Sequence, residues 1–140
     1  MNTHPHYDSS QGTAEQRVLI VDDDDDAGGA LAKVLALKGF DVVLCRDGSS
    51  ALEVLRTGPA PDFILTDLIL PDLDGREVAR QARMLCPTAR IALITGWSLE
   101  EEYATADIDA VFLKPVEIRV ILTDFLAPAS RKTPEPDQQG

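Results

Sequence analysis

Five polar residues each directly follow a short apolar run, and their chemical types suggest a shared site. Asp22 and Asp23 follow the first run, Asp67 the third, Thr95 the fourth and Lys114 the fifth. Three carboxylates gathered without compensation would repel one another, so at least one carboxyl pKa would rise. A hard divalent cation such as Mg²⁺ would remove that cost, because it prefers oxygen ligands. A lysine and a hydroxyl beside the ion would suit a phosphoryl group, which one carboxylate could attack as a nucleophile.

The apolar runs that would position these residues are continuously hydrophobic, which is typical of strands buried on both faces of a parallel sheet. They are Val18–Val21, Val42–Leu44, Phe63–Leu65, Ile91–Ile94 and Val111–Leu113. Stripes with helical spacing alternate with them over Leu31–Lys38, Ala51–Leu55, Val78–Leu85 and Ile118–Phe125, with a weaker one over Ser98–Ala106. The alternation predicts an α/β fold with a parallel sheet and helices on both faces. In such sheets the functional crevice lies at the carboxyl ends of the strands.

The composition excludes several classes of partner. The 140 residues include 24 acids and 13 bases, for a net charge of −11. Nucleic acid and anionic membrane surfaces need a basic patch, so neither is an expected partner. The sequence contains no apolar run of membrane-spanning length and no signal peptide, so we expect a soluble cytoplasmic protein. Cys45 and Cys86 lie outside any metal-ligand spacing and are expected to be reduced and partly buried.

The two ends of the chain differ from the middle. Residues 1–16 are polar and rich in turn formers, which predicts a flexible leader, and residues 128–140 are rich in proline and polar residues, which predicts a disordered tail. Two histidines in the leader, His4 and His6, have no third ligand nearby, so they do not predict a metal site. One domain therefore spans residues 17–127.

Four segments, in this order and spacing, resemble the receiver domain of two-component response regulators. They are VLIVDDD at 18–24, FILTDLILPDLDG at 63–75, IALITG at 91–96 and FLKP at 112–115. The resemblance covers residues 17–127. It implies a doubly wound, flavodoxin-like (βα)5 fold with strand order 2-1-3-4-5.

The resemblance also implies a role for each carboxylate at the strand ends. Asp67 matches the phosphoacceptor, Asp23 the direct ligand of Mg²⁺, and Asp22 the ligand that reaches the ion through water. Asp67 itself and the backbone carbonyl of Ile69 would complete the protein ligands.

Three further roles follow from the same resemblance. Lys114 matches the lysine that pairs with the phosphoryl oxygens, and Thr95 matches the switch hydroxyl that moves toward them. In this family the bond between the lysine and Pro115 is expected to be cis. The LPDLDG stretch, with Pro71 and Gly75, matches the loop after the acceptor strand.

Four residues at or near the expected site would modify how it works. Val111 stands where the family commonly carries an aromatic switch, and the neighbouring Phe112 would point to the opposite side of its strand. Gly96 replaces the more usual alanine and gives the backbone extra freedom. Ile69 and Trp97 flank the site with bulky apolar side chains that cannot orient an attacking water. These two residues lead to the hypothesis of a long-lived phosphoryl group.

The acidic run at 22–26 continues past the site residues. We expect Asp24, Asp25 and Asp26 to cap the first helix, because free N–H groups and the helix dipole favour anions there. Gly28 and Gly29 would weaken that helix by about 1 kcal/mol each relative to alanine.

Three alternatives share part of this pattern. A haloacid-dehalogenase-type phosphatase would use Asp22 and Asp24 as its D-x-D pair, but the sequence lacks its later acidic pair. A pseudo-receiver that only binds partners would have lost a site residue, and none is lost here. A flavin-binding flavodoxin-like protein would need a phosphate-cradling loop where this chain has five aspartates.

The receiver resemblance predicts a bacterial phosphorelay protein rather than a metabolic enzyme. We expect phosphorylation by a histidine kinase or a histidine phosphotransfer protein. No output domain follows in the given chain, so the prediction is a stand-alone receiver. Its downstream protein target, or a second copy, would bind the face around Ser98–Phe125.

Overall fold

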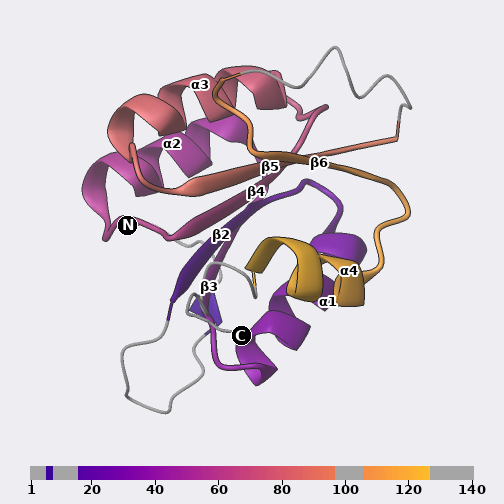
Figure 1. Cartoon of the computed structure of the whole chain (residues 1–140). Helices are drawn as coiled ribbons and strands as arrows, with labels where there is room; N and C mark the ends of the chain where they lie inside the picture. Colours follow the sequence, from indigo (N-terminus) through magenta and orange to yellow (C-terminus); the bar gives the residue numbers. More distant parts are fainter. Residues whose placement is uncertain (1–5, 8–15, 97–105, 127–140) are drawn as a thin grey trace, which may run out of the picture.

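The computed structural model describes residues 6–7, 16–96 and 106–126, whose six strands form one sheet. The strands are β1 (His6–Tyr7), β2 (Arg17–Val21), β3 (Asp41–Cys45), β4 (Phe63–Asp67), β5 (Arg90–Thr95) and β6 (Ala110–Leu113). Their order in the sheet is β1-β3-β2-β4-β5-β6, and all pairs from β3 to β6 are parallel (Figure 1). The five parallel strands therefore have the expected order 2-1-3-4-5.

The sixth strand, β1, lies within the segment for which the sequence predicts a flexible leader. It pairs antiparallel with β3, with His6 opposite Val43 and Tyr7 opposite Val42. Without this pairing β3 would be an edge strand with a row of unpaired backbone groups. A short extended segment can satisfy some of these groups whatever its side chains are, so the apolar pattern gives no sign of it.

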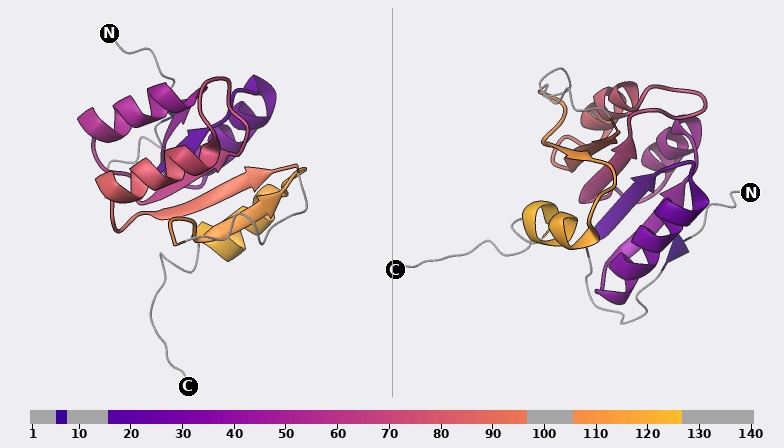
Figure 2. Two further views of the ribbon diagram at one scale, coloured as in Figure 1. Left: turned by 90° about the horizontal axis from the view of Figure 1, so that it is seen from above. Right: turned by 90° about the vertical axis from the view of Figure 1, so that its right-hand side faces the viewer.

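Helices cover both faces of the sheet (Figures 1 and 2). They are α1 (Asp25–Leu37), α2 (Gly48–Thr57), α3 (Gly75–Leu85) and α4 (Ile118–Val120), the last continuing as a π-helical segment, η2 (Ile121–Leu126). The two helices α2 and α3 lie on one face, and α1 lies with α4 and η2 on the other. The four clear helical stripes of the sequence are thus confirmed. The weaker helix expected over Ser98–Ala106 lies outside the described residues, apart from Ala106.

Each face of the sheet has its own hydrophobic core. Leu52 and Val78 of α2 and α3 pack with Ile64 of β4 on one face. On the other face, Phe63 lies edge-to-face with Phe125 of η2 at a centroid distance of 5.5 Å. Because alternate residues of the strands enter opposite cores, the strands are buried on both sides, as their continuous apolar runs predict.

Local signals end the helices as expected. Gly39 follows α1 with φ of 103°, a left-handed conformation that glycine adopts without strain. Gly58 ends α2, and Pro87 follows the last residues of α3. None of the helices in the described part of the chain has the length and hydrophobicity of a transmembrane span.

Both cysteines are free and buried, as the sequence predicts. Burial, helped by the negative charge of Asp47, raises the pKa of the Cys45 thiol to about 12. Burial also raises the pKa of Cys86. Both side chains are therefore neutral at physiological pH and belong to the core.

Candidate functional site at the carboxyl edge of the sheet

The sheet topology brings the five chemistry-bearing residues to one edge. Asp22 and Asp23 directly follow β2, Asp67 ends β4, Thr95 ends β5, and Lys114 directly follows β6. Since these strands are parallel and the first three are neighbours in the order β2-β4-β5, their carboxyl ends meet at the same edge. The convergence expected from the sequence is thus present in the structure.

Three carboxylates form the centre of this edge. Asp22, Asp23 and Asp67 each offer an oxygen, and these oxygens all lie within 4.8 Å of one another. Asp67 is only 3% exposed, and its Oδ1 has no hydrogen-bond partner among the described residues. Its Oδ2 accepts a hydrogen bond from Lys114 Nζ at 3.1 Å. A buried, unpartnered oxygen within a carboxylate cluster fits the donor set of a hard divalent cation.

The electrostatics of the site show its unbalanced negative charge. Burial, followed by the contact with Asp22, raises the pKa of Asp67 to about 7, although Lys114 acts in the opposite direction. Desolvation opposes the protonated form of Lys114, yet its hydrogen bond to Asp67 and the nearby carboxylates raise its pKa. The sequence predicts at least one raised carboxyl pKa at this edge, and Asp67 has it. A bound cation would offset this cost.

The first turn of α1 holds Asp22 in place. The Oδ1 of Asp22 accepts a hydrogen bond from the Asp24 backbone N–H at 2.9 Å. A Cβ atom at Gly28 would lie 3.1 Å from the Asp22 Cβ, which is closer than most real contacts. Gly28 therefore lets the helix approach the site. No local pattern in the sequence assigns this role to Gly28, because only the tertiary packing reveals the approach.

Asp24 caps α1 rather than acting as a second site carboxylate. Its Oδ1 accepts hydrogen bonds from the backbone N–H groups of Asp26 and Ala27, at 3.0 and 3.2 Å. Asp25 and Asp26 occupy the first helical turn, where the dipole favours anions. This confirms the capping prediction, and it gives Asp24 a different task from the second aspartate of a D-x-D phosphatase.

The loop after β4 fixes the backbone of Asp67. Gly75, the first residue of α3, donates its N–H to the carbonyl of Leu68 at 2.6 Å. A Cβ atom at this position would lie 2.0 Å from the Asp67 carbonyl oxygen, so only glycine fits. The buried Thr66 hydroxyl also donates to that carbonyl oxygen, at 3.0 Å. The main chain of Asp67 is thus held from two sides.

A further residue of this loop, Asp72, was missed by the sequence analysis. Its carboxylate accepts hydrogen bonds from the backbone N–H groups of Gly48 and Ser49 at the start of α2, at 2.8 and 2.9 Å. Desolvation opposes ionisation, but the hydrogen bonds from Ser49 and Gly48 lower the pKa of Asp72 to about 2. The contact spans 24 residues, so no local pattern could reveal it.

The residues that would modulate the site lie around it as follows. Thr95 is buried, and its backbone carbonyl accepts from the Lys114 N–H at 2.8 Å. Ile69 is 66% exposed and Gly96 is also exposed. The bond between Lys114 and its following proline is cis, as expected. Trp97 lies outside the described residues.

Val111, which stands where the family commonly carries an aromatic switch, faces the opposite side of β6 from Phe112. Val111 packs against the core under α2 and α3, whereas Phe112 packs against the opposite core. The Phe112 ring lies 6.0 Å from that of Phe125. The two neighbours therefore point to opposite faces, as the sequence analysis expected.

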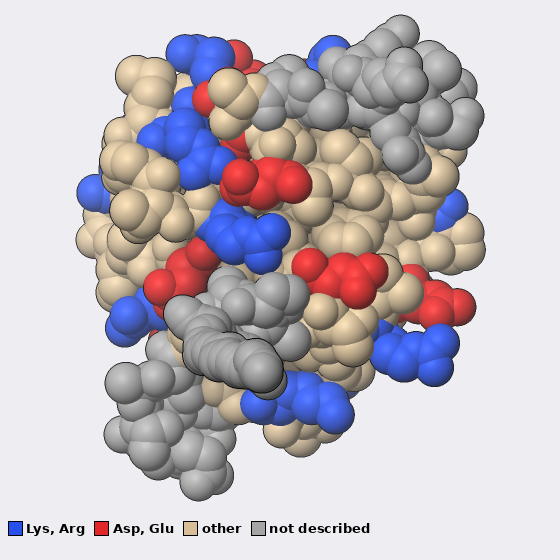
Figure 3. All heavy atoms as spheres, viewed as in Figure 1, with Lys and Arg blue, Asp and Glu red and all other residues tan. Residues whose placement is uncertain are grey.

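Figure 3 shows the distribution of charged side chains on one face of the molecule. Acidic and basic side chains alternate there instead of forming a continuous basic patch. Arg76 pairs with Asp74, and Arg80 pairs with Glu77. Basic side chains engaged in such pairs are less available to phosphate groups.

Comparisons with known sequences agree with this geometry. The family model of the response regulator receiver domain matches residues 18–125. The response regulator MprA of Mycolicibacterium vanbaalenii is 34% identical over 122 residues, which are 85% of this chain and 52% of that protein. MprA of Mycobacterium avium is 33% identical over 126 residues, or 88% of this chain and 55% of that protein. The chain thus spans about half the length of these curated relatives.

Solved structures give the same result. A CheY-like receiver domain protein of Methanospirillum hungatei superposes with a TM-score of 0.73 and 29% identity, over 78% of this chain and 89% of that one. A response regulator of Burkholderia pseudomallei, solved with a phosphorylated aspartic acid, a calcium ion and citrate, has a TM-score of 0.74 and 28% identity. That match covers 83% of this chain and 69% of the other. On these matches and this fold, the chain belongs to the response regulator receiver domain family.

Proposed function

We propose that this receiver domain accepts a phosphoryl group on Asp67 in a reaction that requires Mg²⁺. The protein ligands of the ion would be Asp22, Asp23, Asp67 and the backbone carbonyl of Ile69. The observation that carries the proposal is the Asp67 carboxylate, which is buried with Oδ1 unpartnered among the described residues and Oδ2 on Lys114. The phosphorylated aspartic acid in the Burkholderia pseudomallei relative supports the same chemistry.

The transfer uses groups that already lie at the strand ends. An oxygen of Asp67 attacks the phosphorus of the donor, the bond from phosphorus to the leaving group breaks, and the leaving group departs with the electron pair. Lys114, 3.1 Å from Oδ2, is within reach of the transferred phosphoryl oxygens and offsets their charge. Thr95 at the end of β5 supplies a hydroxyl donor. Bound Mg²⁺ would neutralise carboxylate and phosphoryl charge.

The proposed partners follow from this role in signalling. A histidine kinase or a histidine phosphotransfer protein would supply the phosphoryl group. Phosphorylation of Asp67 would change the protein-binding surface around residues 98–125, where a downstream protein or a second copy would dock. Of this surface the structure describes residues 106–125, which include β6, α4 and most of η2.

The direct test is phosphorylation by acetyl phosphate with Mg²⁺, followed by intact-protein mass spectrometry. We expect one added phosphoryl group in the parent protein and none in Asp67→Asn. Asp26→Asn is the matched control, because Asp26 is exposed in the first turn of α1, and it should be phosphorylated normally. An adduct that persists in Asp67→Asn, or no adduct in the parent protein at any Mg²⁺ concentration, would contradict the proposal.

The lifetime of the phosphoryl group is a second, separate expectation. Ile69 is largely exposed beside Asp67 and has no polar group to orient a water molecule. We therefore expect Ile69→Asn to lose its phosphoryl group faster than the parent protein, as measured by the decay of the mass adduct. Equal decay in the two proteins would show that Ile69 does not protect the phosphoryl group.

A further inference from the structure

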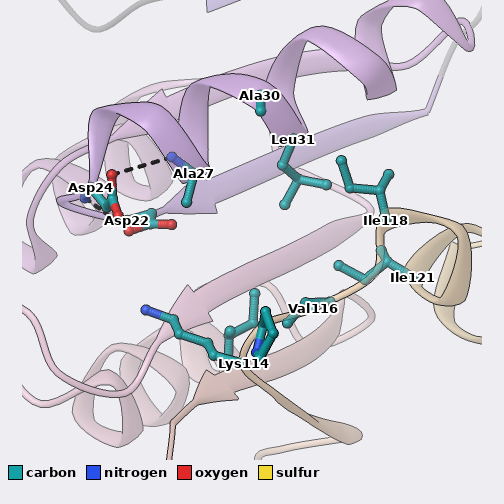
Figure 4. Close-up of a pocket in the computed structure, with 11 residues that line it drawn as sticks. Asp22, Asp24, Ala27, Ala30, Leu31, Lys114, Val116, Ile118 and Ile121 are labelled. Carbon is teal, nitrogen blue, oxygen red and sulfur yellow. Dashed lines mark hydrogen bonds between the residues drawn. The ribbon is translucent and has the colours of Figure 1, made fainter.

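A pocket of about 480 Å³ opens beside the phosphoacceptor, between α1 and the segment from Lys114 to Ile121 (Figure 4). Its volume lies within the range of small-molecule sites. Asp22 and Lys114 point toward each other at one end. Leu31, Ile118 and Ile121 form the other end, so most of the wall is hydrophobic.

The polar end of the pocket belongs to the proposed phosphorylation site. The ammonium group of Lys114 lies 3.1 Å from Asp67 Oδ2, and Asp22 is a member of the carboxylate cluster. The third charged residue of the wall, Asp24, already accepts two backbone N–H groups of α1. The complementary ligand has a phosphoryl group at Lys114 and an uncharged, apolar portion that extends along α1.

We propose that the pocket selects small acyl phosphates with an apolar acyl chain longer than acetyl, such as butyryl phosphate, as phosphoryl donors. The phosphoryl group would lie at Asp67 and Lys114, and the acyl chain would lie along Ala30, Leu31 and Ile118. This rests on the proposed function, because it assigns a donor preference to the same phosphoacceptor.

The reaction balances without a further reactant. A carboxylate oxygen of Asp67 forms the new bond to phosphorus, and the bond between phosphorus and the acyl oxygen breaks. The acyl group leaves as a carboxylate with that electron pair, so no proton or redox partner is consumed. The acyl chain takes no part in the chemistry, and its burial acts on donor binding.

The kinetic test compares butyryl phosphate with acetyl phosphate at equal Mg²⁺, with the phosphorylated protein measured by intact mass. Each buried methylene favours binding by about fourfold, so the two that butyryl adds predict about a fifteenfold faster second-order rate. Ala30→Leu fills the pocket from an exposed position of α1 with another good helix former. It should remove the preference for butyryl phosphate, so that the two acyl phosphates react at similar rates. Ala60→Leu, an exposed loop position outside the pocket, should retain the preference.

A second measurement needs no reaction and is made in the presence of Mg²⁺, which would offset the negative charge of the three carboxylates. Pentylphosphonate has the same number of chain atoms beyond phosphorus as butyryl phosphate and cannot transfer its phosphoryl group. It should shift the NMR methyl resonances of Leu31, Ile118 and Ile121, whereas methylphosphonate should not. In Ala30→Leu these shifts should disappear.

The outcomes separate this proposal from the proposed function. If both acyl phosphates react at equal rates, the donor preference is wrong and phosphorylation of Asp67 stands. If Ala30→Leu slows only transfer from a phosphorylated donor protein, the pocket accommodates that protein instead, and the proposal is likewise overturned. If no donor produces an adduct, the proposed function itself fails.

Discussion

The two faces of the sheet are covered differently. On one face, α2 and α3 pack against each other, and the loop between β4 and α3 joins them because Asp72 caps α2. Gly48 lies so close to this loop that a Cβ atom there would be 2.8 Å from the Leu73 side chain. On the other face, α1 and the α4–η2 segment lie apart (Figure 2), with the 480 Å³ pocket between them.

The two faces therefore differ in what they provide around Asp67: one supports its main chain, and the other leaves space beside Lys114. On the face covered by α2 and α3, which we call the closed face, the Thr66 hydroxyl donates to the Asp67 carbonyl oxygen, and Gly75 at the start of α3 lies directly against that oxygen. The face covered by α1, α4 and η2, which we call the open face, leaves room beside Lys114, where the proposed phosphoryl donor would approach. A rigid support beneath the carboxylate is what the proposed role of Asp67 as a nucleophile requires.

The largest expected loss of stability comes from a substitution at the tightest contact of the closed face, where Gly75 meets the Asp67 carbonyl oxygen. Gly75→Ala should destabilise the protein by about 4 kcal/mol or more, because the new Cβ would meet the Asp67 carbonyl oxygen, which cannot move aside as a flexible side chain can. Urea unfolding measures this loss. Gly29→Ala is the matched control, since nothing lies within 4 Å of its Cβ. That variant should gain up to about 1 kcal/mol from helix propensity. A Gly75→Ala protein as stable as its parent would refute the close fit.

A smaller effect compares the cores of the two faces directly. Leu52→Ala removes a side chain that is 4% exposed from under α2, and it should cost about 3 kcal/mol through lost burial and a residual cavity. Ile118→Ala removes a half-buried side chain from the pocket wall, where solvent can fill the space, and should cost about 1 kcal/mol. The free energy of unfolding in urea gives both values. Equal losses would mean that the pocket face is as tightly packed as the other.

The smallest expected change in stability comes from the cap that Asp72, in the loop between β4 and α3, places on α2. Asp72→Ala should lower the free energy of unfolding by about 1 kcal/mol at neutral pH. This is the loss expected when an exposed carboxylate that caps a helix is removed. Because hydrogen bonds lower the pKa of Asp72 to about 2 in the folded state, its stabilisation is complete above the unfolded pKa of about 3.9. It is lost as the pH falls toward 2. The difference in unfolding free energy between parent and variant should therefore shrink as the pH falls from about 4 to about 2. A difference independent of pH would exclude this role.

The sequence alone determined the parallel sheet and the residues at its functional edge. Each apolar run is long enough to be a buried strand, and the polar residue that ends it is adjacent in the chain, so both are local properties. Asp67, Thr95 and Lys114 could be placed at one edge once the strands were known to be parallel. The cap of α1 by Asp24 is equally local and was also predicted.

Tertiary structure decided the features that depend on distant contacts. Gly28 and Gly75 are demanded by atoms of other segments, and Asp72 meets its partner 24 residues away. The pairing of β1 with β3 and the pocket between α1 and α4 likewise depend on how separate elements approach one another. Hydrophobic periodicity records only which side of an element is buried. How closely two elements pack depends on the shapes of both, so it emerges only when the chain is folded.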